Sequence, residues 1–199
     1  MASQVDICNR ALTKLGAGRI TSISENSKSA RVMAALWDTV RRSELRKRNW
    51  SFAIKRDLLP ALSTAPAWGF ASAFQLPADF LRLVQAHDVF IVPSLTDYRE
   101  GDDSAYAIEA GAILCDFDAP LKIRYVYDVT DPGSFDALFA EALASKLAYE
   151  ACYEVTQSNQ RQDVCNNDYR ASISDAVKTN AIEKPPQGFP DDSWVLGRL

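Results

Sequence analysis

The hydrophobic period changes twice along this chain, and this change constrains the fold more than any other feature of the sequence. Apolar residues recur at helical spacing up to residue 49, alternate every second residue over 50–130, and return to helical spacing over 131–183. Pro and Gly residues divide the central part into short segments, which is typical of a small antiparallel sheet or barrel. The pattern predicts an α+β chain.

The helical parts contain signals for four helices. Ser3 is a predicted N-cap of the first helix, which Gly16 ends. The second helix is expected over about 30–48. Ser134 is the predicted N-cap of the third helix, and the fourth is expected over 158–183. Small residues on the third helix are expected to allow close approach between neighbouring subunits: Ala142, Ala144, Ala148 and Ala151.

The period changes also set the predicted domain boundaries. Residues 1–49 and 131–183 are expected to pack as one antiparallel helical bundle, because helices joined by short turns pair antiparallel. Residues 50–130 form the inserted β domain, whose first alternating segment begins at Ser51. Residues 184–199 contain three prolines and are predicted to form an extended C-terminal arm.

Charge is distributed unevenly along the chain. Residues 1–56 contain twelve Lys/Arg and four Asp/Glu, a net of +8, whereas the whole chain has a net charge of −4. The overall acidity argues against a free-standing nucleic-acid-binding protein. A basic cluster lies at the end of the second predicted helix: Arg41, Arg42, Arg46, Lys47 and Arg48. The helix dipole accounts for one or two of these cations. The others are predicted to face a DNA channel or an acidic neighbour, with a solvated outer face as the alternative.

The residues needed for catalysis or metal binding are sparse. His87 is the only histidine and therefore the only side chain with an ordinary pKa near 7. The four cysteines are too far apart in sequence for the paired spacing of a zinc site: Cys8, Cys115, Cys152 and Cys165. The segment 97–103 lacks the alternating ligands of a calcium loop. We therefore expect no enzyme activity, no metal and no cofactor, and no run of about 18 apolar residues predicts a membrane span.

Several short motifs occur together in a particular order. They are ICNRALTKLG at 7–16, LRKRNWSFA at 45–53, FQLPADFLR at 74–82, Phe135 with EALASKLA at 141–148, and DSWVLGR at 192–198. In this order the chain resembles the head-to-tail adaptor family of tailed bacteriophages, often called tail tubular protein A in short-tailed phages. The resemblance covers nearly the whole chain.

The resemblance implies a structural role in the virion, for a protein assembled in the bacterial host cytoplasm. Family members form rings of typically twelve copies beneath the portal protein, continue the DNA channel, and present a platform to the nozzle or another tail protein. The family has no catalytic residue to carry over. Its C-terminal arm reaches the portal, and the matching portal-docking residues here are Phe189, Trp194, Val195, Leu196 and Arg198.

Two other functions remain open from the residues alone. The basic segment from Arg41 to Arg48 would suit a DNA-binding or regulatory module, although no helix-turn-helix reader or interleaved aromatic residues accompany it. A hydrolase would have only His87 in its favour. The adaptor interpretation predicts a large ring in complex with the portal, and the regulatory one predicts a monomer or dimer with sequence-specific DNA affinity.

Overall fold

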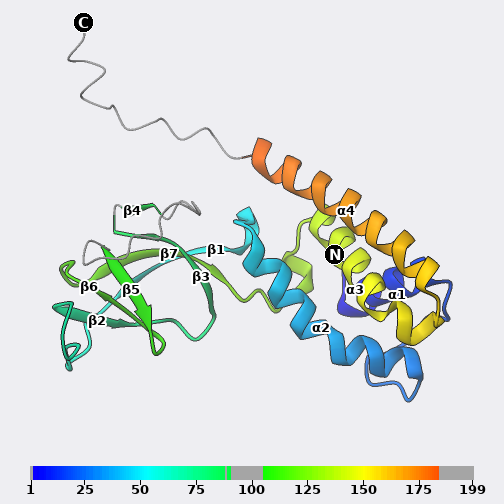
Figure 1. Cartoon of the computed structure of the whole chain (residues 1–199), viewed down its shortest axis with the longest axis horizontal. Coiled ribbons are helices and arrows are strands. Elements are labelled where there is room, and N and C mark those ends of the chain that lie inside the picture. The colour runs from blue at the N-terminus through cyan, green and yellow to red at the C-terminus, as the bar shows by residue number, and fades with distance from the viewer. Residues whose placement is uncertain (1, 88, 91–104, 184–199) are drawn as a thin grey trace, which may run out of the picture.

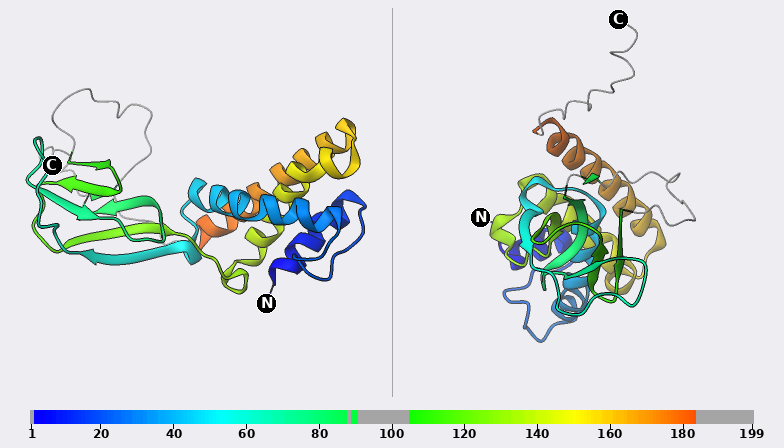
Figure 2. Two further views of the ribbon diagram at one scale, coloured as in Figure 1. Left: turned by 90° about the horizontal axis from the view of Figure 1, so that it is seen from below. Right: turned by 90° about the vertical axis from the view of Figure 1, so that its left-hand side faces the viewer.

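Helices and strands occupy opposite ends of an elongated molecule, and the fold class is α+β, as predicted. The computed structural model describes residues 2–87, 89–90 and 105–183. Four helices form a helical lobe, and two antiparallel sheets form a β lobe (Figure 1). Figure 2 shows the same separation from two further directions. The predicted arm and the acidic segment 97–103 lie outside the described residues.

The first two helices begin and end at residues with a clear physical reason to do so. Helix α1 (Gln4–Leu15) starts at a capping box in which the Ser3 and Asp6 side chains each accept from the other residue's backbone N–H. It ends at Gly16, whose positive φ of 71° suits the left-handed C-cap. Helix α2 (Lys28–Lys47) is capped by Ser27 and begins two residues before the predicted position.

The predicted N-cap of the third helix is wrong. Helix α3 (Ala137–Thr156) is capped by Asp136, whose Oδ1 accepts from the backbone N–H groups of Leu138 and Phe139. Ser134 instead ends a short 3₁₀ helix, η2 (Pro132–Ser134), that precedes α3. Helix α4 (Asn159–Ile182) follows after a tight turn and runs along α3.

Helix α3 is the central helix of the helical lobe, because α1, α2 and α4 all pack against it. Its buried residues therefore lie on several sides of the helix: Phe139, Ala142, Leu143, Ala144, Ser145, Leu147, Ala148, Ala151 and Cys152. All four of the predicted subunit-contact alanines are among them. Their small side chains allow close packing inside one chain, so the expectation that they pack between subunits is corrected.

The β lobe consists of two antiparallel sheets. One has the strand order β1-β7-β3-β4, formed by β1 (Ile54–Leu59), β7 (Leu121–Tyr127), β3 (Phe80–Ala86) and β4 (Val89–Phe90). The other has the order β2-β6-β5, formed by β2 (Ser72–Gln75), β6 (Ala112–Cys115) and β5 (Tyr106–Glu109). The predicted strand start at Ser51 is wrong, because residues Ser51–Ala53 form a short 3₁₀ helix, η1.

Two hydrophobic cores meet where the lobes join. The core of the β lobe includes Phe74, Ile113 and Tyr125. The larger core belongs to the helical lobe but also includes Leu81 and Val126, on strands β3 and β7. The lobes are therefore in apolar contact. Across the described residues, no helix is long and apolar enough to cross a membrane.

Candidate functional site at the junction of the lobes

The C-terminal ends of α2 and α4 both point toward the β lobe (Figure 1), so the basic end of α2 lies at the junction of the lobes. Helix α2 ends because the backbone becomes extended at Arg48, with φ −136° and ψ 162°. The following Trp50 is buried, and its Nε1 donates to the carbonyl oxygen of Glu44 at 3.1 Å. This indole also packs edge-on against Phe139 of α3, with ring centroids 5.0 Å apart.

The first two residues of the predicted basic cluster bind the linker that returns from the β lobe. Arg41 is only 3% exposed, and its Nη1 donates to a carboxylate oxygen of Asp128 and, at 2.6 Å, to the carbonyl oxygen of Val129. Its Nη2 donates to Asp38 at 3.2 Å. The exposed Arg42 places Nε 3.3 Å from the other oxygen of Asp128. Arg41 therefore cannot face a channel.

Lys47 is engaged by a buried carboxylate. Glu44 is 1% exposed, and it accepts from Lys47 Nζ at 2.5 Å and from the Tyr169 hydroxyl at 2.9 Å. Burial acts to lower the pKa of Lys47, but the hydrogen bond and charge of Glu44 outweigh it, so the pKa is raised. Burial and the same carboxylate raise the pKa of the Tyr169 hydroxyl. This trio ties α2 to α4.

Three arginines at the junction make no ion pair with the described residues. Arg46 donates from Nη1 to the carbonyl oxygen of Leu81, and the exposed Arg48 makes no hydrogen bond with the described part of the chain. The third is Arg82 of β3, which is half-buried and donates from Nη2 to Asn49 Oδ1. Burial, and secondarily the charge of Arg46, lower the pKa of Arg82.

Sequence reasoning missed Arg82, because it lies 33 residues from its Asn49 partner within an alternating strand. The available signal was its position, because Arg82 is the one charged residue in the segment Phe80–Ala86. In the structure, strand β3 carries it under the end of α2. Arg82 therefore adds a cation to the junction that the predicted basic cluster on α2 did not include.

A shallow pocket of about 370 Å³ lies beside these side chains. Its lining residues define the junction pocket: Lys47, Arg48, Asn49, Arg82, Val177, Asn180 and Ala181. Asn180 of α4 fixes one wall, since its Nδ2 donates to the carbonyl oxygen of Asn49 at 3.1 Å and its Oδ1 accepts from the Ser51 N–H at 2.8 Å. The pocket brings Lys47 and Arg48 of the predicted cluster together with Arg82, whereas Arg42 and Arg46 line a separate hollow across α2.

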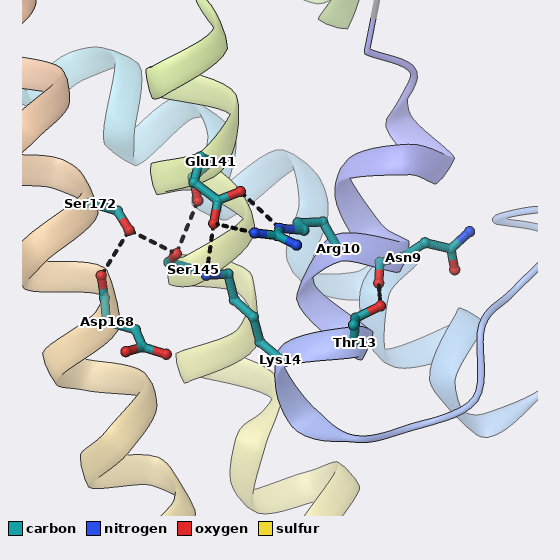
Figure 3. Close-up of polar contacts among 8 residues, drawn as sticks. All are labelled: Asn9, Arg10, Thr13, Lys14, Glu141, Ser145, Asp168 and Ser172. Carbon is teal, nitrogen blue, oxygen red and sulfur yellow. Dashed lines mark hydrogen bonds and ion pairs between the residues drawn. The ribbon is translucent and has the colours of Figure 1, made fainter.

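A second polar cluster lies inside the helical lobe and has a structural explanation. Arg10 and Lys14 of α1 both bind Glu141 of α3 (Figure 3), with N···O distances of 3.0 and 2.8 Å. Burial raises the pKa of Glu141, but its hydrogen bonds to these cations outweigh that effect and the pKa is lowered. The hydroxyls of Ser145 and Ser172 lie 3.2 Å apart and connect α3 to α4. The cluster joins three helices.

The remaining candidates from the sequence are placed as follows. The His87 ring stacks on Phe117, with centroids 5.0 Å apart. All four cysteines are buried free thiols, and burial raises the pKa of Cys8 to about 12. In the described ranges, no three His, Cys, Asp or Glu side chains are placed to hold a metal ion. The predicted portal-docking residues Phe189, Trp194, Val195, Leu196 and Arg198 lie outside the described residues.

No protein-family model matches the chain, and no curated protein matches it.

Proposed function

We propose that this protein is a ring-forming head-to-tail adaptor of a tailed bacteriophage, a structural virion protein that docks under the portal, continues the DNA channel and provides the attachment platform for the tail. The observation that carries the proposal is the two-lobed subunit. The termini build one helical lobe and the middle of the chain builds a β lobe that projects from it. The order of motifs that resembles the adaptor family runs through both lobes.

Each lobe exposes apolar side chains of its own, which suits contacts with different partners. The β lobe exposes Trp68 at 84%, and Trp68 lines a pocket of about 350 Å³ together with residues of β5 and β6. The helical lobe exposes Tyr153, Val164 and Ile182 along α3 and α4. Exposed tryptophan is a frequent anchor of protein interfaces. In the proposed adaptor, the helical lobe contacts neighbouring copies and the portal, and the β lobe contacts the tail nozzle or another tail protein.

The DNA channel would be lined by cations that form no ion pair with the described residues. Arg46 and Arg48 are exposed and make no ion pair with the described residues. Because Arg46 also donates to the Leu81 carbonyl, Arg48 is the residue of the predicted cluster best suited to this role. A ring repeats each charge once per subunit, so that weak phosphate contacts add and depend on salt. Arg41 contributes to the fold instead.

The mass of the protein in solution tests the proposal. The full chain mixed with the portal protein of the same phage is expected to form a complex containing about twelve copies, measured by native mass spectrometry. A chain ending at Glu183 is expected to keep the melting temperature of the full chain and to lose portal binding. Mixtures that contain only free monomers or dimers would contradict the adaptor function, and portal binding by the shortened chain would contradict the role of the arm.

A DNA-binding or regulatory module is the second candidate, and the same arginines, which form no ion pair with the described residues, favour it. A regulator would bind one DNA sequence in preference to others, as a monomer or dimer. An adaptor would bind DNA with no sequence preference and with steep salt dependence. Competition between a selected and a scrambled duplex, read by fluorescence anisotropy, separates the two functions.

A further inference from the structure

The junction pocket has a marked excess of positive charge. Its lining contains Lys47, Arg48 and Arg82 and no acidic side chain. Glu44 neutralises Lys47 from the protein interior, whereas neither Arg48 nor Arg82 forms an ion pair with the described residues. Two guanidinium groups therefore share one pocket without a counter-ion from the described part of the chain.

Arg82 is in an unfavourable environment for a cation. It is half-buried, and among the described residues its Nη2 donates to the neutral side chain of Asn49 while its buried Nε has no hydrogen-bond acceptor. Removing a charged group from water without a paired charge is unfavourable. The surrounding fold nevertheless holds this side chain in place, because β3 pairs along β7 and the Leu81 carbonyl beside it accepts from Arg46.

We propose that the junction pocket binds a phosphate group, with the guanidinium groups of Arg82 and Arg48 as its ligands. Arginine presents a planar set of donors that matches two phosphate oxygens at once. An anion in the pocket would accept hydrogen bonds from N–H groups that have no acceptor among the described residues, and its negative charge would offset the repulsion between Arg82 and Arg46. A pocket of about 370 Å³ has room for a phosphate and part of the molecule that carries it.

The phosphate could belong to a nucleic-acid backbone or to a small molecule such as free phosphate, and the chemistry at the pocket is the same. The proposal rests on the residues of one chain and does not depend on ring formation. Subunits that form a normal ring but have lost phosphate binding would leave the adaptor function intact. Subunits that bind phosphate but form no ring would contradict only the adaptor function.

Calorimetric titration of the full chain with inorganic phosphate, at constant ionic strength, tests the pocket. Arg48→Gln is the main variant, because Arg48 makes no hydrogen bond with the described residues and its loss should leave the fold unchanged. We expect phosphate affinity to fall about tenfold or more in Arg48→Gln and in Arg82→Gln, as for loss of a charged hydrogen bond. Arg170→Gln, which removes an exposed arginine of α4 outside the pocket, is the matched control and should bind as the unchanged protein does.

Two further titrations identify the source of the phosphate and its selectivity. A 20-base-pair DNA duplex that competes with phosphate, and binds more weakly to both pocket variants, would identify the backbone phosphodiester as the ligand. Phosphate binding without competition by the duplex would identify a small phosphate compound. Citrate at the same ionic strength should bind more weakly than phosphate. The proposal is overturned if phosphate does not bind, if citrate binds equally well, or if Arg48→Gln and Arg82→Gln bind phosphate as the control does.

Discussion

Replacing Arg41 by Ala is expected to destabilise the protein strongly, although the sequence predicts that the basic cluster containing Arg41 lies on the surface. Its guanidinium is buried and holds Asp128 and the Val129 carbonyl, which begin the linker back to the helical lobe. With alanine at position 41, the Asp128 carboxylate and the Val129 carbonyl would each lose a hydrogen-bond donor. Removing one partner of a buried pair costs about 3–5 kcal/mol.

The structure places the expected cost at the lower end of that range. Asp128 keeps a second cation, since Arg42 Nε lies 3.3 Å from its other oxygen, and the Asp128 side chain is about one-fifth exposed. We therefore expect a loss of about 3 kcal/mol in the free energy of unfolding. For a chain of this length, such a loss lowers the melting temperature by about 6–12 °C.

Urea unfolding followed by circular dichroism measures this loss, with Arg42→Ala as the matched control. Arg42 bonds the same carboxylate from an exposed position, so its removal should cost no more than about 1 kcal/mol. Equal losses of stability in the two variants, or a loss below about 1 kcal/mol in Arg41→Ala, would contradict a structural role for Arg41. A double-mutant cycle that combines Arg41→Ala with Asp128→Asn measures the interaction free energy between the two side chains.

Three smaller perturbations test other contacts. The pKa of Glu141 is lowered in the fold, so its ion pairs stabilise the protein above the ordinary pKa near 4.5. This stabilisation is lost as the pH falls below that value toward the lowered pKa. Glu141→Gln should therefore weaken the decrease in melting temperature with falling pH. Tyr169→Phe should cost about 1–3 kcal/mol in urea unfolding, because buried Glu44 loses a donor, whereas Tyr153→Phe at an exposed position should cost almost nothing. Gly16→Ala should cost about 1 kcal/mol, from backbone strain alone, since a new Cβ would have only an ordinary contact at 3.6 Å; a loss above about 2 kcal/mol would contradict this account.

Local signals predicted the elements well wherever one residue decided the structure. Gly16 ends α1 because few other residues adopt its left-handed conformation, and the Ser3 capping box starts the helix. The N-cap of α3 was harder, because Ser134 and Asp136 are both good caps two residues apart. Only the 3₁₀ helix stabilised by the Asp131 carboxylate, which accepts from Gly133 N–H, decides between them.

The candidate site could be predicted only in part, because its members come from distant parts of the chain. The cluster on α2 is visible as a run of charges, yet the partner of Arg41 lies 87 residues away at Asp128. Counting charges cannot separate a cation that holds the fold from one that is free to bind. The same limit hid Arg82, whose importance depends on its position beneath the end of α2.

The junction therefore divides the basic cluster between two roles, and this division determines which experiments can report on function. Arg41 binds the returning linker, and Arg46 binds the Leu81 carbonyl on β3, so changing either one alters how the lobes are held together. A loss of activity in those variants would follow from altered structure as readily as from a lost contact with a partner. Arg48 carries its charge without any hydrogen bond to the described residues. Substitution there is the change at this junction that separates recognition of an anion from stability of the fold.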